Sequence, residues 1–106
     1  MTMVVYALAK LKPGVDPKEY ERYVREVDYP TAAKLASITH YRTHRINEMP
    51  DVPGGPWDYI ERIEITDRAT YERDLTTDGK ALIDELFEKY LERSRTHLLW
   101  TERLDP

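Results

Sequence analysis

Two acidic residues of this sequence, Asp28 and Glu61, lie in segments whose pattern takes side chains out of water. Asp28 belongs to the stretch EVDYPTAAKL, where an apolar helical face meets Pro30. Proline removes a backbone donor and crowds the preceding turn, so the helix should bend or break here. Asp28 borders the apolar face, where it could hold a substrate N–H or accept a proton. Alternatively, it could cap the second half of the broken helix by accepting from backbone amides.

Glu61 lies in the alternating segment WDYIERIEI, residues 57–65. Because alternate residues of a strand share a face, five side chains lie together: Trp57, Tyr59, Glu61, Ile63 and Ile65. A carboxylate in such a mostly apolar layer is desolvated, which raises its pKa and suits a general acid or base. The alternative is a position near the end of the sheet, or an ion pair with an arginine such as Arg45.

The aromatic residues are strongly biased towards side chains with a polar tip. The sequence holds eight Tyr and two Trp against one Phe. Tyr23, Tyr59 and Trp57 could form an aromatic box for a flat substrate, with phenol groups as hydrogen-bond donors. Tyr29, beside Asp28, is a further candidate for substrate binding. Ordinary core packing is the competing interpretation for each of them.

The three histidines do not form a metal site by their spacing. His40 and His44 share a face of one strand but lie roughly 13 Å apart, and the strand that carries His97 is roughly 14 Å away across the sheet. The sequence has no Cys, which excludes thiolate ligands and a thiol nucleophile. We therefore predict no metal. His44 alone is the candidate proton shuttle, with a surface histidine on an edge strand as the alternative.

Composition excludes several classes of function. The 106 residues, 41% of them hydrophobic, suit a single domain over residues 1–106. The net charge is -4 and no basic block occurs, which argues against a nucleic-acid partner. No apolar run approaches the roughly 20 residues that span a bilayer, and the N-terminus lacks a signal pattern. We expect a cytoplasmic protein without a membrane partner. Phosphate-binding, Ser-elbow and HExxH motifs are also missing from the sequence.

The pattern of elements predicts one fold. Strands are expected over 3–12, 37–47, 57–65 and 96–104, with helical regions after Asp16 and after Asp67. The second helical region should break near 76–79. This order predicts an α+β, ferredoxin-like βαββαβ fold with a four-stranded antiparallel sheet and two helices on one face. The Pro- and Gly-rich loop 48–56 could be a lid, a dimer clasp or an idle connection.

The other face of this sheet also needs cover. Apolar strand residues include Val4, Leu8, Ile60, Leu98 and Trp100, and some of them must lie on that face. A single chain of this length has no further element to place there. We therefore predict a homodimer in which two sheets face each other.

Several segments resemble a known superfamily. LAKLKPGVDPKEYERYVREVDYPTAAKLASITHYRTHRI is similar to the opening half of the dimeric α/β-barrel proteins, especially the EthD-like branch, and WDYIERIEITD is similar to their third strand. The family's Glu-Val-His-Gly-Pro segment corresponds here to residues 26–30, so that Asp28 stands in place of His. Taken whole, the chain is most similar to the RedY-like (HapK-type) proteins that accompany prodiginine and bisindole biosynthesis.

The resemblance implies a cofactor-free enzyme that acts on a reactive aromatic intermediate. It implies a pocket between the helices and the sheet, with the face that carries Glu61 turned towards the helices. In related polyketide cyclases, a pocket Tyr corresponds to Tyr23, and two histidines correspond to Tyr59 and Val5. Those two differences mean that the reaction of the cyclases does not carry over.

These observations give a working hypothesis. The chain is expected to be a homodimeric, cofactor-independent cyclase or dehydratase for an indole- or pyrrole-type intermediate, with Asp28, Glu61 or His44 as proton carriers. One alternative is a non-catalytic protein that binds and shields such an intermediate. The other is a cofactor-free monooxygenase.

Overall fold

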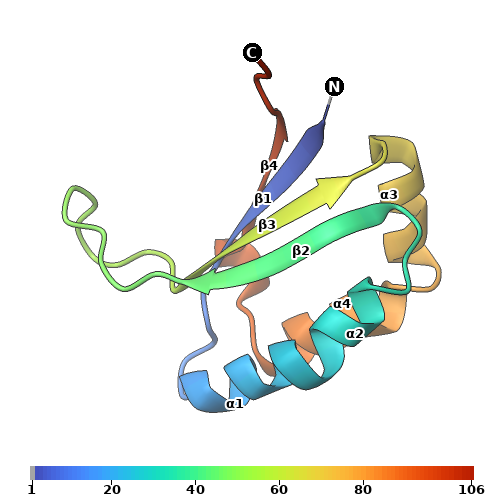
Figure 1. The fold of residues 1–106 in the computed structure, drawn as a ribbon. Helices are drawn as coiled ribbons and strands as arrows, with labels where there is room; N and C mark the ends of the chain where they lie inside the picture. Colours follow the sequence, from blue (N-terminus) through green and yellow to red (C-terminus); the bar gives the residue numbers. More distant parts are fainter. Residues whose placement is uncertain (1) are drawn as a thin grey trace.

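Four strands form one antiparallel sheet in the computed structural model, which describes residues 2–106 (Figure 1). The strands are β1 (Met3–Ala9), β2 (Ile38–Arg45), β3 (Tyr59–Ile65) and β4 (His97–Glu102). Their order across the sheet is β2-β3-β1-β4. The predicted α+β, ferredoxin-like fold is confirmed.

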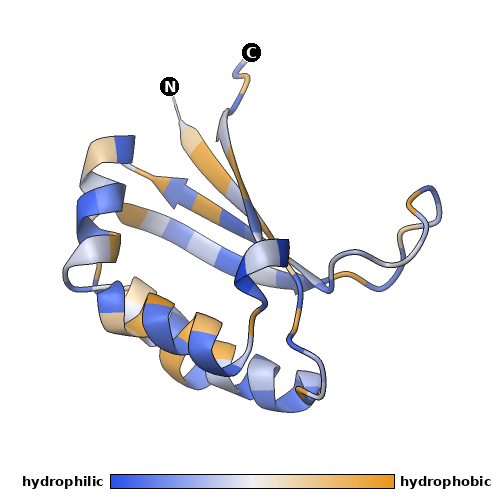
Figure 2. Cartoon of the chain, turned by 180° about the vertical axis from the view of Figure 1, so that it is seen from behind, coloured by the Kyte–Doolittle hydropathy of each residue, from blue (hydrophilic) through white to orange (hydrophobic). Residues whose placement is uncertain are grey.

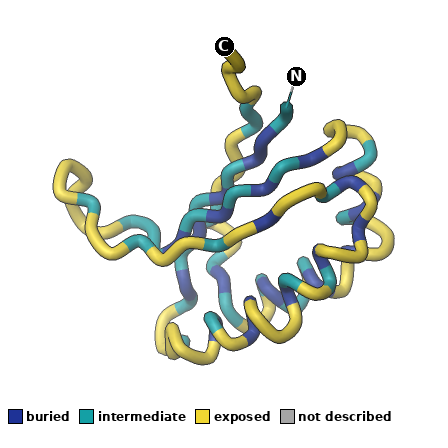
Figure 3. The backbone as a smooth tube through the Cα atoms, viewed as in Figure 1, coloured by how far each residue is buried: buried dark blue, intermediate teal, exposed yellow. Residues whose placement is uncertain are grey.

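The helices cover one face of this sheet. The first helical region consists of α1 (Pro17–Tyr23), the π-helix η1 (Val24–Asp28) and α2 (Tyr29–Ala32). The second consists of α3 (Arg68–Thr76) and α4 (Lys80–Lys89), with the short 3₁₀-helix η2 (Arg93–Arg95) before the last strand. Buried residues line the space between the helices and the sheet (Figure 3). Within residues 2–106, no helix has the length and apolar character needed to cross a bilayer.

The first helical region widens ahead of Pro30 and continues through it, so the break that was one of our two expectations does not occur. The N–H of Tyr29 donates to the carbonyl of Val24, five residues back. Because Pro30 has no N–H to continue the ordinary pattern, the turn before it is free to widen. The wide turn ends at Asp28, which is buried at 2% exposure. The sequence around Pro30 thus places a carboxyl between the helix and the sheet.

Strand alternation places Glu61 on the helix-covered face. Along β3, every second residue from Tyr59 to Ile65 is buried, and the residues between are half-buried. Figure 2, coloured by hydropathy, shows hydrophilic and hydrophobic residues mixed along the strands. Glu61 lies opposite Ala7 on β1 and Thr43 on β2. It is therefore a central position of the sheet that faces the helices.

Two apolar clusters flank this position. One contains Tyr20, Tyr23 and Tyr59 with the apolar face of α4. The other contains Val5, Ala32, Tyr41, Ile63, Ile65 and Tyr71. Glu61 follows Tyr59 and precedes Ile63 on β3, so that it is the polar residue between two dry regions.

The opposite face of the sheet carries no helix within the described part of the chain (Figure 1). Strand pairing places Leu99, which is 43% exposed, beside Tyr6 on this face. The loop between β2 and β3 stretches away from the end of the sheet (Figure 1). The sheet therefore presents a partly apolar outer surface.

Candidate functional site

Asp28 and Glu61 meet at one phenol oxygen, that of Tyr41. The Tyr41 hydroxyl lies 2.6 Å from Oδ2 of Asp28 and 3.0 Å from Oε1 of Glu61. Oγ1 of Thr43 also lies 3.1 Å from it. Asp28, Tyr41 and Glu61 are 2%, 8% and 9% exposed. The three groups come from η1, β2 and β3, so the tertiary fold alone brings them together.

Burial changes the acidity of both carboxyls in the same direction. Desolvation raises the pKa of Asp28, and the hydrogen bond from Tyr41 offsets part of that rise. Desolvation raises the pKa of Glu61 further, since the neighbouring charge of Asp28 adds to it. Two carboxyls this close resist ionising together. The pair therefore tends to hold a shared proton near neutral pH.

The alternatives left open by the sequence can be compared with this geometry. The Asp28 side chain makes no capping hydrogen bond at the start of α2 within the described residues. Arg45 pairs with Glu21 on α1, and not with Glu61. Both carboxyls are thus held in the interior by a phenol and not by a cap or an ion pair.

Two hollows adjoin this site: both carboxyls line the first, and Glu61 alone of the pair lines the second. The first has a volume of about 370 Å³, including the part open to solvent, and is lined by Asp28, Tyr41, Glu61 and apolar residues of α2, α3 and α4. The second, about 860 Å³ by the same measure, lies between the sheet and the α3–α4 side. Its walls are Ala7, Glu61, Ile63, Tyr71, Leu75, Ile83, Leu86, Phe87, Leu91, Arg93, Thr96 and Leu98. Glu61 lines both hollows.

The wall of the larger hollow includes solvent-exposed groups. Leu98 is 51% exposed. The guanidinium of Arg93 stacks 4.0 Å from the centroid of the Phe87 ring. An apolar molecule could enter beside these residues and reach Glu61 without passing a charged carboxylate. The hollow therefore combines mostly apolar walls with one acid, Glu61.

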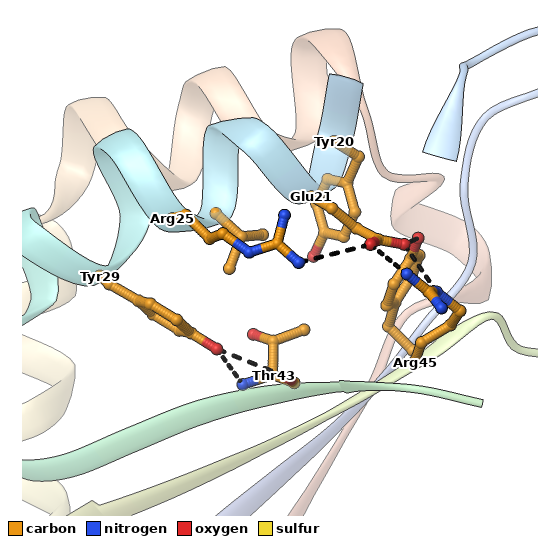
Figure 4. Close-up of a pocket in the computed structure, with 8 residues that line it drawn as sticks. Tyr20, Glu21, Arg25, Tyr29, Thr43 and Arg45 are labelled. Atoms are coloured by element: carbon orange, nitrogen blue, oxygen red, sulfur yellow. Dashed lines mark hydrogen bonds and ion pairs between the residues drawn. The ribbon is translucent and has the colours of Figure 1, made fainter. Parts of the chain in front are cut away.

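A separate polar pocket of about 430 Å³, including open solvent, lies between α1 and β2 (Figure 4). In it, Glu21 bonds Arg45 and also accepts 2.7 Å from the hydroxyl of Tyr59. The Arg45 bonds, with help from Tyr59, hold the pKa of Glu21 down at about 2. Figure 4 shows Arg25 turned towards the same carboxylate. The charges of this pocket largely satisfy one another.

Of the four predicted aromatic residues, Tyr23 and Tyr59 belong to one core cluster, and Tyr29 packs against it. The ring of Tyr23 lies 4.8 Å from that of Tyr90 in the core, and Tyr59 reaches Glu21. Tyr29 accepts from the backbone N–H of Thr43 at 2.8 Å, and its ring meets Tyr41 edge-on at 5.4 Å.

Trp57 precedes β3 and packs edge-on against His97 at 6.2 Å. Of the predicted box of Tyr23, Tyr59 and Trp57, the two tyrosines share a core cluster and Trp57 is not part of it.

His44 lies apart from the carboxyl pair. It is exposed, and it pairs across the strands with Ile60, whose side chain points away from the helices. Residues 2–106 contain no group of three or more His, Asp or Glu side chains arranged to hold a metal ion.

The comparisons with known proteins agree with this architecture. The sequence matches the family model described as REDY-like protein HapK over residues 3–104. The chain belongs to the REDY-like HapK family.

The solved structure of HapK from Hahella chejuensis is 27% identical, with a TM-score of 0.78, over 98% of this chain and 94% of that one. An EthD-family protein from Bacillus halodurans shares the fold at 16% identity and a TM-score of 0.72, covering 98% and 100% of the two chains. A dimeric ferredoxin-like protein from Thermobifida fusca shares the fold at 12% identity and a TM-score of 0.70, over 97% of this chain and 92% of that one. No curated protein sequence matches the chain.

Sequence reasoning missed two tyrosines of this REDY-like protein. Tyr41 joins the two carboxyls, and Tyr71 lines both hollows. Alternation within residues 37–47 places Tyr41 and Thr43 on one face, which is the available signal. The register against β3, which shifts between Ile38 and His40, decides that this face meets Glu61.

The buried acid predicts an unusual dependence of stability on pH. Because the pKa of Glu61 is raised in the folded protein, the folded state binds more protons than the unfolded state above about pH 4. The free energy of unfolding should therefore fall as pH rises from there through the folded pKa. Glu61→Gln should flatten this slope, by up to about 1.4 kcal/mol per pH unit, in urea unfolding between pH 5 and 9.

Glu102→Gln, which removes an exposed carboxylate on β4, is the matched control and should keep the wild-type slope. An unchanged slope in Glu61→Gln would show that Glu61 is ionised in the folded protein and is not desolvated.

Proposed function

We propose that this REDY-like protein is a cofactor-independent cyclase or dehydratase that acts on an indole- or pyrrole-type intermediate. The observation that supports the proposal is the pair of buried carboxyls, Asp28 and Glu61, with Glu61 on the wall of an apolar hollow. A buried pair whose pKa values are raised can hold both an acid and a base at neutral pH.

The reaction needs only proton transfers. One carboxyl donates a proton to a leaving hydroxyl, so that the C–O bond breaks and water departs. The other accepts a proton from the ring nitrogen or a neighbouring carbon, and the released electron pair forms the new bond. The net change is loss of water, and the new bond is either a double bond or the bond that closes a ring. The protein ends with the same number of protons. Walls that exclude bulk water limit hydrolytic side reactions.

The hollow suits a flat, mostly apolar substrate. Most of the residues that line it are apolar or aromatic. Tyr71, Ile83 and Phe87 offer faces on which an aromatic ring could pack. Arg93 and Thr96 are the polar groups that could orient a heteroatom near the solvent-exposed side.

Hydrogen–deuterium exchange at carbon 3 of indole tests this assignment without knowledge of the natural substrate. Exchange at this carbon needs an acid to add a proton and a base to remove one. In D₂O near neutral pH the wild-type protein should accelerate the exchange, measured by proton NMR. Asp28→Asn and Glu61→Gln should each lower the acceleration about 100-fold or more, as expected for loss of a general acid or base.

Glu102→Gln serves as the control and should exchange at the wild-type rate. Full exchange activity in both carboxyl variants would overturn the assignment. Binding of indole by calorimetry without any acceleration in the wild-type protein would favour the shielding function over the catalytic one.

We further propose that the protein works as a homodimer with its sheets face to face. The outer surface carries Leu99, 43% exposed, and the half-buried Tyr6, Leu8 and Ile60. The fold relative from Thermobifida fusca is described as dimeric. A second copy would bury these residues and gain about 25 cal/mol for each Å² of apolar area removed from water.

Sedimentation velocity at micromolar concentration tests this association. The wild-type protein should sediment as a dimer, and Leu99→Arg should shift it to a monomer because a charge would be buried between the sheets. Val27→Arg, at a residue 38% exposed on η1, is the control and should stay dimeric. A monomeric wild-type protein would contradict the proposal.

A further inference from the structure

The Tyr41 hydroxyl has one proton to donate but three oxygen atoms within hydrogen-bonding distance. A phenol carries one proton to donate and can accept others through its oxygen. Three oxygens lie within hydrogen-bonding distance of it, those of Asp28, Glu61 and Thr43. Tyr41 can therefore donate to only one carboxyl. The remaining carboxyl needs a proton of its own if its contact with the phenol is to be a hydrogen bond.

The two distances identify which carboxyl is which. A hydroxyl that donates to a carboxylate anion lies about 2.5–2.7 Å from it, whereas neutral O–H···O bonds are longer. The contact to Asp28 is 2.6 Å and the contact to Glu61 is 3.0 Å. Asp28 therefore fits the ionised acceptor, and Glu61 fits the neutral acid that donates to the phenol oxygen. Thr43 can donate to the same oxygen at 3.1 Å.

We propose that Tyr41 is a positioning residue that fixes the direction of proton transfer, with Asp28 as the carboxylate base and Glu61 as the acid. The protonation states follow from the distances, and only their use in catalysis rests on the proposed function. The order Glu61–H, Tyr41–H, Asp28⁻ uses one proton for each hydrogen bond and leaves one negative charge on the pair. Glu61, the acid, is also the carboxyl that lines the larger hollow.

The same phenol can restore the site after each turnover. When Glu61 has given its proton to the leaving group and Asp28 has gained one, the pair is in the reverse order. Asp28 then passes its proton to the Tyr41 oxygen while Tyr41 passes its own to Glu61. No O–H bond is gained or lost in total, and the starting state returns without solvent.

The surroundings favour this single negative charge. The titratable groups that face the pair are phenols, Tyr20 from α1, Tyr29 from α2 and Tyr71 from α3, while α4 contributes apolar Leu82 and Leu86. Burial and the nearby carboxyls raise the pKa of Tyr20 and Tyr71, so both phenols stay neutral. Across the described residues, no lysine or arginine forms a salt bridge with Asp28 or Glu61. A second negative charge would have no cation to balance it.

Carboxyl carbon-13 NMR of the free protein tests the assignment. With labelled Asp and Glu, and with Asp28→Asn and Glu61→Gln used to identify the signals, each carboxyl can be titrated between pH 4 and 10. In the wild-type protein Asp28 should ionise at lower pH than Glu61. Tyr41→Phe should move the ionisation of Asp28 to higher pH by about one to two units, since it loses a hydrogen bond to its charged form.

The reverse order in the wild-type protein, with Glu61 ionising first, would overturn the proposal even if Tyr41→Phe fails to fold. An unchanged Asp28 titration in a folded Tyr41→Phe protein would also overturn it. Tyr6→Phe, at a half-buried position on the outer face, is the control and should leave both titrations unchanged. The titration uses no substrate, so its result stands whether or not the proposed catalytic function is correct.

Discussion

The site depends on one constraint, which is that two buried carboxyls share a single phenol. Leaving a charged group in a dry interior without a partner is costly, and a hydrogen bond to a charged group contributes about 1.5–3 kcal/mol. The Tyr41 hydroxyl supplies that bond to Asp28 at 2.6 Å and also contacts Glu61. The protein can therefore keep two acids beside an apolar hollow, at positions that apolar residues fill in most protein cores.

Three features of the chain together satisfy this constraint. The wide turn before Pro30 carries Asp28 inward, and the alternation of β3 turns Glu61 towards the helices. The pairing of β2 with β3 brings Tyr41 and Thr43 alongside Glu61. Each feature has an ordinary structural cause, such as a missing proline donor or strand pleating. Their combination is the feature of this REDY-like fold that suits proton transfer.

Local patterns in the sequence were sufficient to predict the strands and the helical regions, and to place Glu61 on the same face as Tyr59 and Ile63. That this face meets the helices was implied by the family resemblance. The capping residue Asp16 accepts from the N–H of Lys18, and Asp67 accepts from that of Thr70, so both helix starts could be recognised from sequence. The break between α3 and α4 includes Gly79, where a Cβ would lie 3.0 Å from the carbonyl of Asp74. These features depend on neighbours close in sequence.

The composition of the site depended on contacts that the sequence does not display. Tyr41 is separated from Glu61 by 20 residues, and only the strand register joins them. The third strand was predicted to begin at Trp57, but it begins two residues later, at Tyr59. Just before it, the Asp58 carboxylate instead accepts from the N–H of Leu11 at 2.9 Å. The helix was expected to kink or break at Pro30 because proline removes a donor. It does not break, because a wider turn tolerates that loss.

Infrared difference spectroscopy of the folded protein near neutral pH measures the shared proton most directly. We expect the carbonyl stretching band of a protonated carboxylic acid in a dry environment, shifted in D₂O and missing from Glu61→Gln. A spectrum in which the wild-type protein and Glu61→Gln do not differ in this region would mean that Glu61 carries no proton, and would contradict the account.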